Sequence, residues 1–272
     1  VSIGLSSDEK YYFINTSDHN TSEQYYFEFS EKNPKPKLIQ KREKGILYSV
    51  NSWDGYFYMH TNKNAEDFKI DKTNSKNFDK WETFIPAKDE TLIGGLTFLN
   101  NWIIRSEPSG ALGKILVRNI KTNTEEELIF SEEKVYDGAV SLIQKDKNTD
   151  LIQISYSTPK TQSRVFLYNL KTKEKKLVKE QIIPSGHNPY NYIVERLDCD
   201  SHDGKKIPLT IIRNKKTKID GNAKLLLYGY GSYGNSMSPS FSSNKFSLID
   251  RDIIWVTAVS YTHLTLPTKR IV

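Results

Sequence analysis

The chain has very little cysteine and no long apolar stretch. Its 272 residues include one cysteine, Cys199, so an intrachain disulfide framework is excluded and a reducing compartment is indicated, by default the cytoplasm. No apolar run approaches the roughly 20 residues that a membrane-spanning helix needs, so we expect no membrane partner. Because the chain begins at Val1 rather than Met, the absence of a targeting segment carries little weight for this expectation.

Motifs for a metal ion or a nucleophile are missing as well. The sequence has no His-Glu-x-x-His motif and no paired cysteines, so we predict neither a metal site nor a cofactor. It also lacks a Gly-x-Ser-x-Gly segment, because Ser232 lies in Gly-Ser-Tyr-Gly without the required flanking glycines. Surface or propeller roles are expected for His19, His60, His187 and His202.

Charge of one sign is not concentrated in any region. The 39 basic and 33 acidic side chains give a net charge of +6, but they are mixed along the chain, as where Glu174 interrupts the lysines between Lys171 and Lys179. Nucleic-acid binding requires a basic stripe with stacking aromatic side chains, whereas the aromatic residues here fall inside strand-like runs. We therefore expect no nucleic-acid partner.

A repeated pattern fills the first 180 residues. Turn signals precede aromatic or aliphatic runs that begin at Tyr11, Tyr56, Trp102 and Leu151, with spacings of 45, 46 and 49 residues. One run precedes each of these and two follow, which gives four strands per unit, the make-up of a propeller blade. The leading strands are expected at 1–5, 46–50, 92–98 and 140–143, the third strands at 25–29, 68–70, 115–117 and 165–168, and the closing strands at 38–39, 83–85, 128–130 and 177–178.

Four blades are therefore predicted in residues 1–182. Because known propellers use about 4 to 8 blades, a closed ring of four is one solution. Val1 enters in mid-strand without a capping partner, which favours a larger ring that has lost its first blades. The alternative is a β-sandwich, which fits the regular spacing less well.

The pattern changes after Glu180. The segment 183–189 is rich in residues that break regular structure, and it is followed by a strand at 192–197. Asp203 and Gly204 indicate a hairpin turn before a strand at 207–212. Short apolar runs at 225–227 and 253–256 are typical of strands buried on both faces, so we predict the beginning of an α/β domain in residues 183–258.

Three glycines after the run at 225–227 invite a comparison with dinucleotide sites. Gly229, Gly231 and Gly234 match Gly-x-Gly-x-x-Gly, but that motif needs a helix to open at once so that its free N–H groups face the pyrophosphate. The residues that follow include Pro239 and form a poor helix start. The hypothesis of a nucleotide-binding oxidoreductase therefore accounts only for this glycine-rich loop.

Tyrosines in the same loop fit another chemistry better. In α/β-hydrolases the loop after the third strand supplies one donor of the oxyanion hole, and a tyrosine hydroxyl can take the place of a backbone N–H there. The alternative is that Tyr228, Tyr230 and Tyr233 are core aromatic residues whose hydroxyls lie at the rim.

The loop from Tyr228 to Gly234 resembles the prolyl oligopeptidase family of serine peptidases, specifically its oligopeptidase B branch. Segments 239–242 and 247–251 support the resemblance, as do 61–65, 155–159, 195–197 and 203–208, and it covers residues 1–258. It implies a mainly β fold. Residues 1–182 would be a partial, about four-bladed portion of a seven-bladed β-propeller, and residues 183–258 the first strands of an α/β-hydrolase domain.

The resemblance also implies a function. The family hydrolyses short, unfolded oligopeptides in the cavity between its two domains, and the oligopeptidase B branch cuts after Arg or Lys. By position, Tyr230 matches the tyrosine whose hydroxyl helps bind the oxyanion, and Tyr233 lies near the pocket for the residue before the cleaved bond. The catalytic Ser, Asp and His and the acidic specificity residues would lie beyond this chain, which we expect to be inactive alone. A non-catalytic propeller that binds proteins is the rival hypothesis.

The family pattern stops at Ala258. Where the family continues with His/Asn-x-Arg-Gly-Gly-Gly, this chain has a segment, 259–268, that resembles one reading frame of a transposase adapter used in sequencing libraries. We expect residues 259–272 not to be native protein. An unbroken natural reading frame through the Ala258 codon would contradict this expectation.

Overall fold

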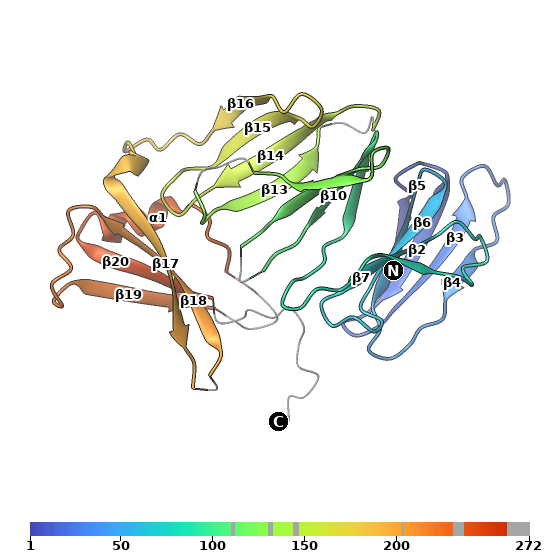
Figure 1. Cartoon of the computed structure of the whole chain (residues 1–272), viewed down its shortest axis with the longest axis horizontal. Helices are drawn as coiled ribbons and strands as arrows, with labels where there is room; N and C mark the ends of the chain where they lie inside the picture. The colour runs from blue at the N-terminus through green and yellow to red at the C-terminus, as the bar shows by residue number, and fades with distance from the viewer. Residues whose placement is uncertain (110–111, 130–132, 144–146, 203, 231–236, 260–272) are drawn as a thin grey trace. The chain divides into compact units, whose positions relative to one another are not determined.

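A computed structural model describes residues 1–109, 112–129, 133–143, 147–202, 204–230 and 237–259 of the chain. Within these residues the fold is built from twenty strands, a single turn of 3-10 helix and one short α-helix (Figure 1). No helix in the described part of the chain is both long and apolar enough to cross a membrane. The chain divides into two compact units, Val1–Phe98 with Ile103–Ser106 and Leu99–Trp102 with the residues from Glu107 onward.

Four sheets of four strands each follow one another along the sequence, and each is a simple meander of neighbouring strands. The first contains β1 (Ser2–Leu5), β2 (Tyr11–Ser17), β3 (Ser22–Glu28) and β4 (Lys37–Gln40). The second contains β5 (Tyr48–Trp53), β6 (Tyr56–Thr61), β7 (Lys69–Thr73) and β8 (Glu82–Ile85). The third contains β9 (Leu96–Leu99), β10 (Trp102–Ser106), β11 (Ile115–Asn119) and β12 (Thr124–Glu127). The fourth contains β13 (Asp137–Leu142), β14 (Leu151–Ser157), β15 (Arg164–Asn169) and β16 (Lys175–Glu180).

The repeat predicted from the sequence is confirmed. Strands β2, β6, β10 and β14 begin at Tyr11, Tyr56, Trp102 and Leu151, the four residues at which the aromatic and aliphatic runs start. Local turn chemistry fixes these starts. Between β5 and β6, for example, a two-residue loop places Asp54 at φ 49° and Gly55 at φ 80°, the positive angles that a tight hairpin turn requires.

The closing strand of the third sheet was predicted in the wrong place. The apolar run at 128–130 led us to expect a strand there, but β12 is Thr124–Glu127 and all four of its residues are exposed. A turn sets this register, because Asn119 Oδ1 accepts the N–H groups of Lys121 at 3.0 Å and Thr122 at 3.1 Å. The outermost strand of a blade has one free edge, so acidic residues are tolerated there, while Leu128 is buried just beyond the strand.

Aromatic side chains form the core of the first unit. Tyr11, Tyr26, Phe57 and Phe78 contact one another, with ring centroids of Tyr11 and Phe57 5.0 Å apart and of Phe57 and Phe78 4.9 Å apart. Aromatic pairs in such tilted and edge-on arrangements stabilise a core beyond their buried area by about 0.5–1.5 kcal/mol each. The first and second sheets therefore share one core.

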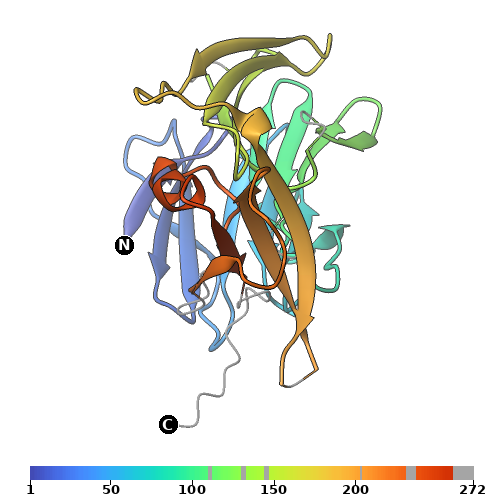
Figure 2. The same ribbon diagram turned by 90° about the vertical axis from the view of Figure 1, so that its left-hand side faces the viewer.

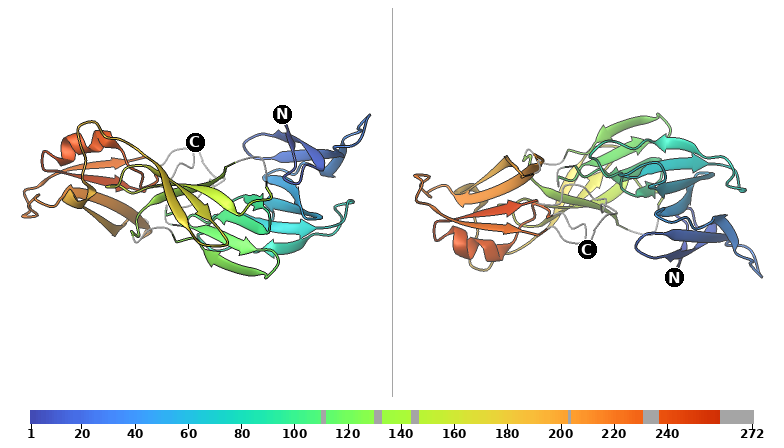
Figure 3. Two further views of the ribbon diagram at one scale, coloured as in Figure 1. Left: turned by 90° about the horizontal axis from the view of Figure 1, so that it is seen from above. Right: turned by 90° about the horizontal axis from the view of Figure 1, so that it is seen from below.

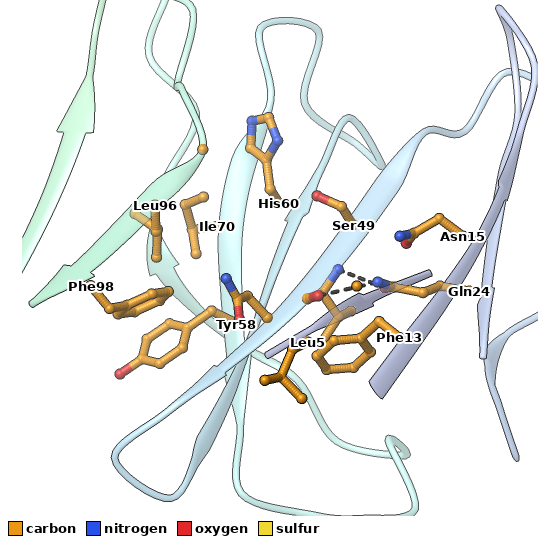
Figure 4. A pocket seen from close by; sticks show the side chains of 14 residues that line it. Leu5, Phe13, Asn15, Gln24, Ser49, Tyr58, His60, Ile70, Leu96 and Phe98 are labelled. Carbon is orange, nitrogen blue, oxygen red and sulfur yellow. Dashed lines mark hydrogen bonds between the residues drawn. The ribbon is translucent and has the colours of Figure 1, made fainter. Parts of the chain in front are cut away.

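A buried glutamine also joins these two sheets. Gln24 on β3 donates from Nε2 to the carbonyl of Val50 on β5 at 3.2 Å and accepts the Val50 N–H at 2.7 Å. Its own N–H donates to the Tyr48 hydroxyl at 2.8 Å, and that hydroxyl donates to the Gln40 carbonyl at 2.6 Å. Gln24 lines a cavity of about 260 Å³ (Figure 4). The polar groups that the two sheets bury here satisfy one another.

The second unit contains a fifth sheet with a different order. It contains β17 (Tyr192–Asp200), β18 (Lys206–Asn214), β20 (Ile253–Ala258) and β19 (Lys224–Gly229), in that order, after the 3-10 turn at Pro189–Asn191. The strands β17 and β18 form a long antiparallel hairpin, drawn in orange in Figure 2. The helix α1 (Ser243–Ile249), drawn in red, packs against β18 and β20 (Figure 3). A parallel β19–β20 pair with a helix between its strands is the βαβ unit of an α/β fold.

One expectation for this sheet was wrong. The run at 225–227 was predicted to be buried on both faces, yet Leu225 is 57% exposed and Leu227 63% exposed. The reason is that, among the strands that the structure describes, β19 lies at the edge of the sheet and pairs with β20 alone. The other apolar run fits the prediction on one face only, because Ile254 and Val256 on β20 are buried whereas Ile253 and Trp255 are half-buried.

Candidate oxyanion site

The candidate site lies at the carboxyl ends of β19 and β20. These strands run parallel, and their last residues, Gly229 and Ala258, are directly paired. Tyr230 is the first residue after β19. In open α/β sheets, ligands bind outside the carboxyl ends of parallel strands, because the loops that follow those strands meet there. The sheet therefore places Tyr230 where the chemistry of such folds occurs.

Neither described tyrosine of this loop is a core residue. Tyr230 is 41% exposed and Tyr228 44% exposed, and the Tyr228 ring lies 6.1 Å from that of Trp255 on β20. The alternative that the loop tyrosines are only core aromatics thus does not describe these two. An exposed phenol at a strand end is free to donate a hydrogen bond to a bound group. Tyr233, the second residue assigned to the site by resemblance, lies outside the described residues.

The segment after the loop argues against a dinucleotide site. Residues 237–242 are not helical, and α1 begins only at Ser243, with Ser242 as its N-cap. A pyrophosphate site needs a helix that opens directly after the glycines. The helix here instead packs Phe246 and Ile249 into a core with Tyr192 and Ile212. The poor helix start expected from the sequence at Pro239 is confirmed.

His187 lies beside this core rather than on an open surface. Its ring stacks on Tyr192 at a centroid distance of 5.3 Å, and the rings of Phe241 and Phe246 meet it edge-on at 5.1 Å and 4.6 Å. His187 Nε2 is 2.6 Å from the carbonyl oxygen of Lys160. Because a carbonyl only accepts, Nε2 carries the proton. This histidine thus ties the segment 183–189 to the β14–β15 turn of the fourth sheet, which is a structural task.

Tyr192 makes a second polar contact beneath α1. Its hydroxyl donates to Asp250 Oδ1 at 2.8 Å, at the C-terminal end of the helix. Burial raises the pKa of Tyr192 to about 12, with the hydrogen bond to Asp250 and the charge of that carboxylate acting in the same direction. The phenol therefore stays neutral at physiological pH and acts as a fixed donor.

The histidines His19, His60 and His202 lie away from the site. His60 belongs to the first unit, where its Nε2 lies 2.6 Å from the carbonyl of Ile93 and burial lowers its pKa. His19 and His202 are exposed. The described residues contain no group of three His, Cys, Asp or Glu side chains arranged to hold a metal ion.

The tail predicted to be non-native begins with one described residue. Val259 directly follows β20 and is 1% exposed. Its N–H donates to the carbonyl of Pro208 on the neighbouring strand β18 at 2.9 Å. Residues 260–272 lie outside the described residues. The origin of the tail stays a prediction.

Sequence reasoning missed the role of the aromatic residues around His187. It placed His187 in a segment of structure breakers, and it did not link that segment to Phe241 and Phe246, which lie more than fifty residues later. A cluster of this kind is set by tertiary packing and leaves no local periodic signal.

Comparison with solved structures identifies the same architecture. Oligopeptidase B from Trypanosoma brucei with covalently bound antipain, in its closed form, matches with a TM-score of 0.88 and 24% sequence identity over 97% of this chain and 39% of that chain. Oligopeptidase B from Leishmania major matches with a TM-score of 0.85 and 21% identity over 95% of this chain and 38% of that one. At these identities the likeness shows the fold.

Sequence comparisons agree with the structural ones. The chain is 29% identical over 262 residues to a dipeptidyl aminopeptidase BI of Pseudoxanthomonas mexicana and 25% identical over 256 residues to a protease 2 of Moraxella lacunata. These alignments cover 95% and 94% of this chain but 36% of each relative, so the chain spans little more than a third of their length. The family model for the N-terminal β-propeller domain of prolyl oligopeptidase matches residues 1–181. The chain therefore belongs to the prolyl oligopeptidase family, and its residues 1–181 correspond to that family's N-terminal β-propeller domain.

Proposed function

We propose that the full-length protein carrying this chain is a serine oligopeptidase that hydrolyses short peptides after Arg or Lys, with the Tyr230 hydroxyl as one donor to the oxyanion. The observation that carries this proposal is the position of Tyr230, exposed and directly after β19 at the carboxyl ends of two parallel strands. Two relatives support a peptidase activity, since one bears the name protease 2 and another is an oligopeptidase B, whereas the preference for Arg or Lys rests on the family resemblance.

The proposed role of Tyr230 is electrostatic. Attack of a serine hydroxyl, supplied by residues beyond this chain, on the peptide carbonyl forms a carbon–oxygen bond and leaves negative charge on the carbonyl oxygen. The Tyr230 O–H donates a hydrogen bond to that oxygen and keeps its proton. Collapse of the intermediate breaks the carbon–nitrogen bond, and the leaving amine takes up the proton that the serine lost. A donor fixed before the reaction stabilises the intermediate without reorganisation at the moment of attack.

A second activity is favoured by one specific observation. The relative with 29% identity is named a dipeptidyl aminopeptidase, an enzyme named for releasing dipeptides from a free N-terminus. The two activities share the acyl-enzyme chemistry and differ in whether the substrate's α-amino group must be free.

The experiment uses the complete reading frame. The purified full-length protein is assayed with chromogenic peptides that end in Arg, Lys or Pro, each with a free and with a blocked N-terminus. We expect turnover of the blocked Arg and Lys peptides, inhibition by a serine-directed reagent, and no turnover by the 272-residue chain. Cleavage of free dipeptide substrates alone would favour the second activity, and no cleavage by the full-length protein would contradict both.

A further inference from the structure

A cavity of about 260 Å³ in the first unit has an apolar and a polar side. Four strands contribute the apolar side, which lies at the bottom of Figure 4 and consists of Leu5, Phe13, Tyr58 and Phe98. The polar side chains at the top of the view are Asn15, Ser49 and His60. An apolar cavity of about 150 Å³ is large enough for a benzene molecule, so this cavity has room for an amino-acid side chain together with its backbone amide.

Two side chains on the polar side have hydrogen-bonding groups to spare. Neither the Asn15 carboxamide nor the Ser49 hydroxyl is hydrogen-bonded to a residue that the structure describes. Asn15 lies directly opposite Gln24 across β2 and β3, and Ser49 lies directly opposite His60 across β5 and β6. A carboxamide and a hydroxyl can each donate and accept, so both groups can serve a ligand.

His60 adds a fixed acceptor on the same side. Its Nε2 lies 2.6 Å from the carbonyl oxygen of Ile93, and because a carbonyl only accepts, Nε2 carries the proton. Burial lowers the pKa of His60, so the imidazole is neutral at physiological pH and its Nδ1 has a free lone pair. The ring stacks on Phe68 at a centroid distance of 4.6 Å, which holds its orientation.

The wall of the cavity already contains an example of the bonding that Asn15 can offer. The Gln24 carboxamide pairs with both backbone groups of Val50, donating to its carbonyl at 3.2 Å and accepting its N–H at 2.7 Å. Asn15 carries the same functional group on the same sheet face as Gln24. Its carboxamide can therefore pair with the N–H and C=O of one bound peptide residue as Gln24 does with Val50.

Charge narrows the class of ligand further. Among the described residues that line the cavity there is no Asp, Glu, Lys or Arg. An ionised ligand would lose its hydration here without gaining a counter-charge, which is costly. A neutral ligand with one apolar group beside one N–H and one C=O fits both sides of the cavity. An apolar residue in the interior of a peptide has this chemistry.

We propose that this cavity is a peptide-binding site for one apolar residue of an uncharged peptide segment. The side chain of the bound residue lies against Phe13 and Phe98, and its backbone N–H and C=O pair with the Asn15 carboxamide. Ser49 and His60 Nδ1 serve the neighbouring peptide group. The inference goes beyond the proposed function, because the site belongs to the first unit and does not depend on Tyr230.

The first test attaches the probe at the cavity itself. In the full-length protein, Ser49→Cys places a thiol at an exposed position of the cavity wall, and Cys199, an exposed free thiol in the other unit, is the internal control. The protein is equilibrated with the disulfides of N-acetyl-leucyl-cysteamine and of N-acetyl-glycyl-cysteamine, and mass spectrometry measures labelling at each thiol. Burial of the leucine side chain should favour the leucyl probe about 10-fold at position 49 and not at Cys199. Equal labelling by the two probes at position 49 would overturn the proposal.

The second test asks whether Asn15 binds the peptide backbone. Loss of one hydrogen bond weakens binding about 5-fold, so Asn15→Ala in the Ser49→Cys protein should lower leucyl labelling at position 49 by about 5-fold or more. Asn15→Asp keeps the shape of the side chain but removes its donor, and it should act in the same direction. The matched control is Asn20→Ala, an exposed asparagine of the same unit, which should change nothing.

A purely apolar cavity would give a different result. If leucyl labelling is the same in Asn15→Ala, Asn15→Asp and Asn20→Ala, the backbone is not bound by Asn15 and the proposal is overturned. Circular dichroism and melting temperatures verify that each variant is folded, as expected for an asparagine without a described hydrogen-bond partner. Both tests measure labelling and not hydrolysis, so their outcome is independent of the role proposed for Tyr230.

Discussion

The imidazole of His187 lies parallel to the phenol ring of Tyr192, with centroids 5.3 Å apart and ring planes inclined by 10°. The same histidine donates to the Lys160 carbonyl of the fourth sheet. One side chain in the segment 183–189 therefore contacts both the last blade and the first strand of the sheet that carries Tyr230.

Replacing His187 with Ala should destabilise the second unit. The substitution removes three ring contacts and one hydrogen bond, and because the side chain is half-buried we expect a loss of about 1–3 kcal/mol in the free energy of unfolding, less than for a fully buried aromatic residue. His187→Phe retains the ring contacts and should lose about 1 kcal/mol. Urea unfolding followed by circular dichroism measures both. Equal stability of the wild type and His187→Ala would contradict the structural role.

Tyr192 should make stability depend on alkaline pH. Its pKa is raised to about 12 in the folded state, from an ordinary value of 10.0. A raised pKa contributes stability that is fully present below about pH 10 and is lost as the pH rises toward 12. A shift of this size corresponds to about 2–3 kcal/mol.

The measurement compares the wild type with Tyr192→Phe. We expect the wild type to be the more stable protein at pH 9, by about 1 kcal/mol for the lost hydrogen bond, and this advantage to shrink or reverse by pH 12. Tyr190→Phe, two residues away and 79% exposed, serves as the control. A stability difference between wild type and Tyr192→Phe that does not change with pH would contradict the account.

Gln24 should be among the least replaceable residues of the first unit. It is 3% exposed and satisfies both backbone groups of Val50, so Gln24→Met would leave a buried N–H and a buried carbonyl unpaired. We expect a loss of about 2–4 kcal/mol in the free energy of unfolding, against less than about 1 kcal/mol for Gln40→Met on the neighbouring edge strand. Thermal unfolding of the two variants measures both losses. Similar melting temperatures for Gln24→Met and Gln40→Met would contradict the role of Gln24 in joining the two sheets.

The four-blade repeat could be predicted from the sequence because the second strand of each blade follows a local turn signal. The runs at Tyr11, Tyr56, Trp102 and Leu151 each follow a turn signal, and a hairpin turn such as Asp54-Gly55 is specified by its own residues.

The wrong prediction for β12 shows that apolar runs alone do not locate every strand. Asn119 accepts the N–H groups of the residues two and three positions later, and Asn169 does the same in the fourth sheet with Lys171 and Thr172. This recurring Asn-x-Lys-Thr turn locates the last strand of both blades. The strand it starts in the third sheet is acidic, so a search for apolar runs passes over it.

The candidate site was only partly predictable. The position of Tyr230 followed from a glycine-rich loop after an apolar run and from the family resemblance. The exposure of Leu225 and Leu227 depends on β19 being an edge strand, which is a property of the whole sheet. The contacts of His187 depend on residues far away in sequence, and no local pattern encodes such pairs.

The central claim is that the Tyr230 hydroxyl stabilises the oxyanion, and one comparison tests it most directly. In the full-length enzyme, Tyr230→Phe removes a hydroxyl on a side chain that is 41% exposed, and Tyr228→Phe removes one on a side chain that is 44% exposed in the same loop. Loss of a single oxyanion donor lowers kcat by about 10² to 10³, so we predict a fall of that size for Tyr230→Phe and little change for Tyr228→Phe, with both proteins folded. Equal kcat values for Tyr230→Phe and the wild type on a blocked Arg peptide would contradict the account.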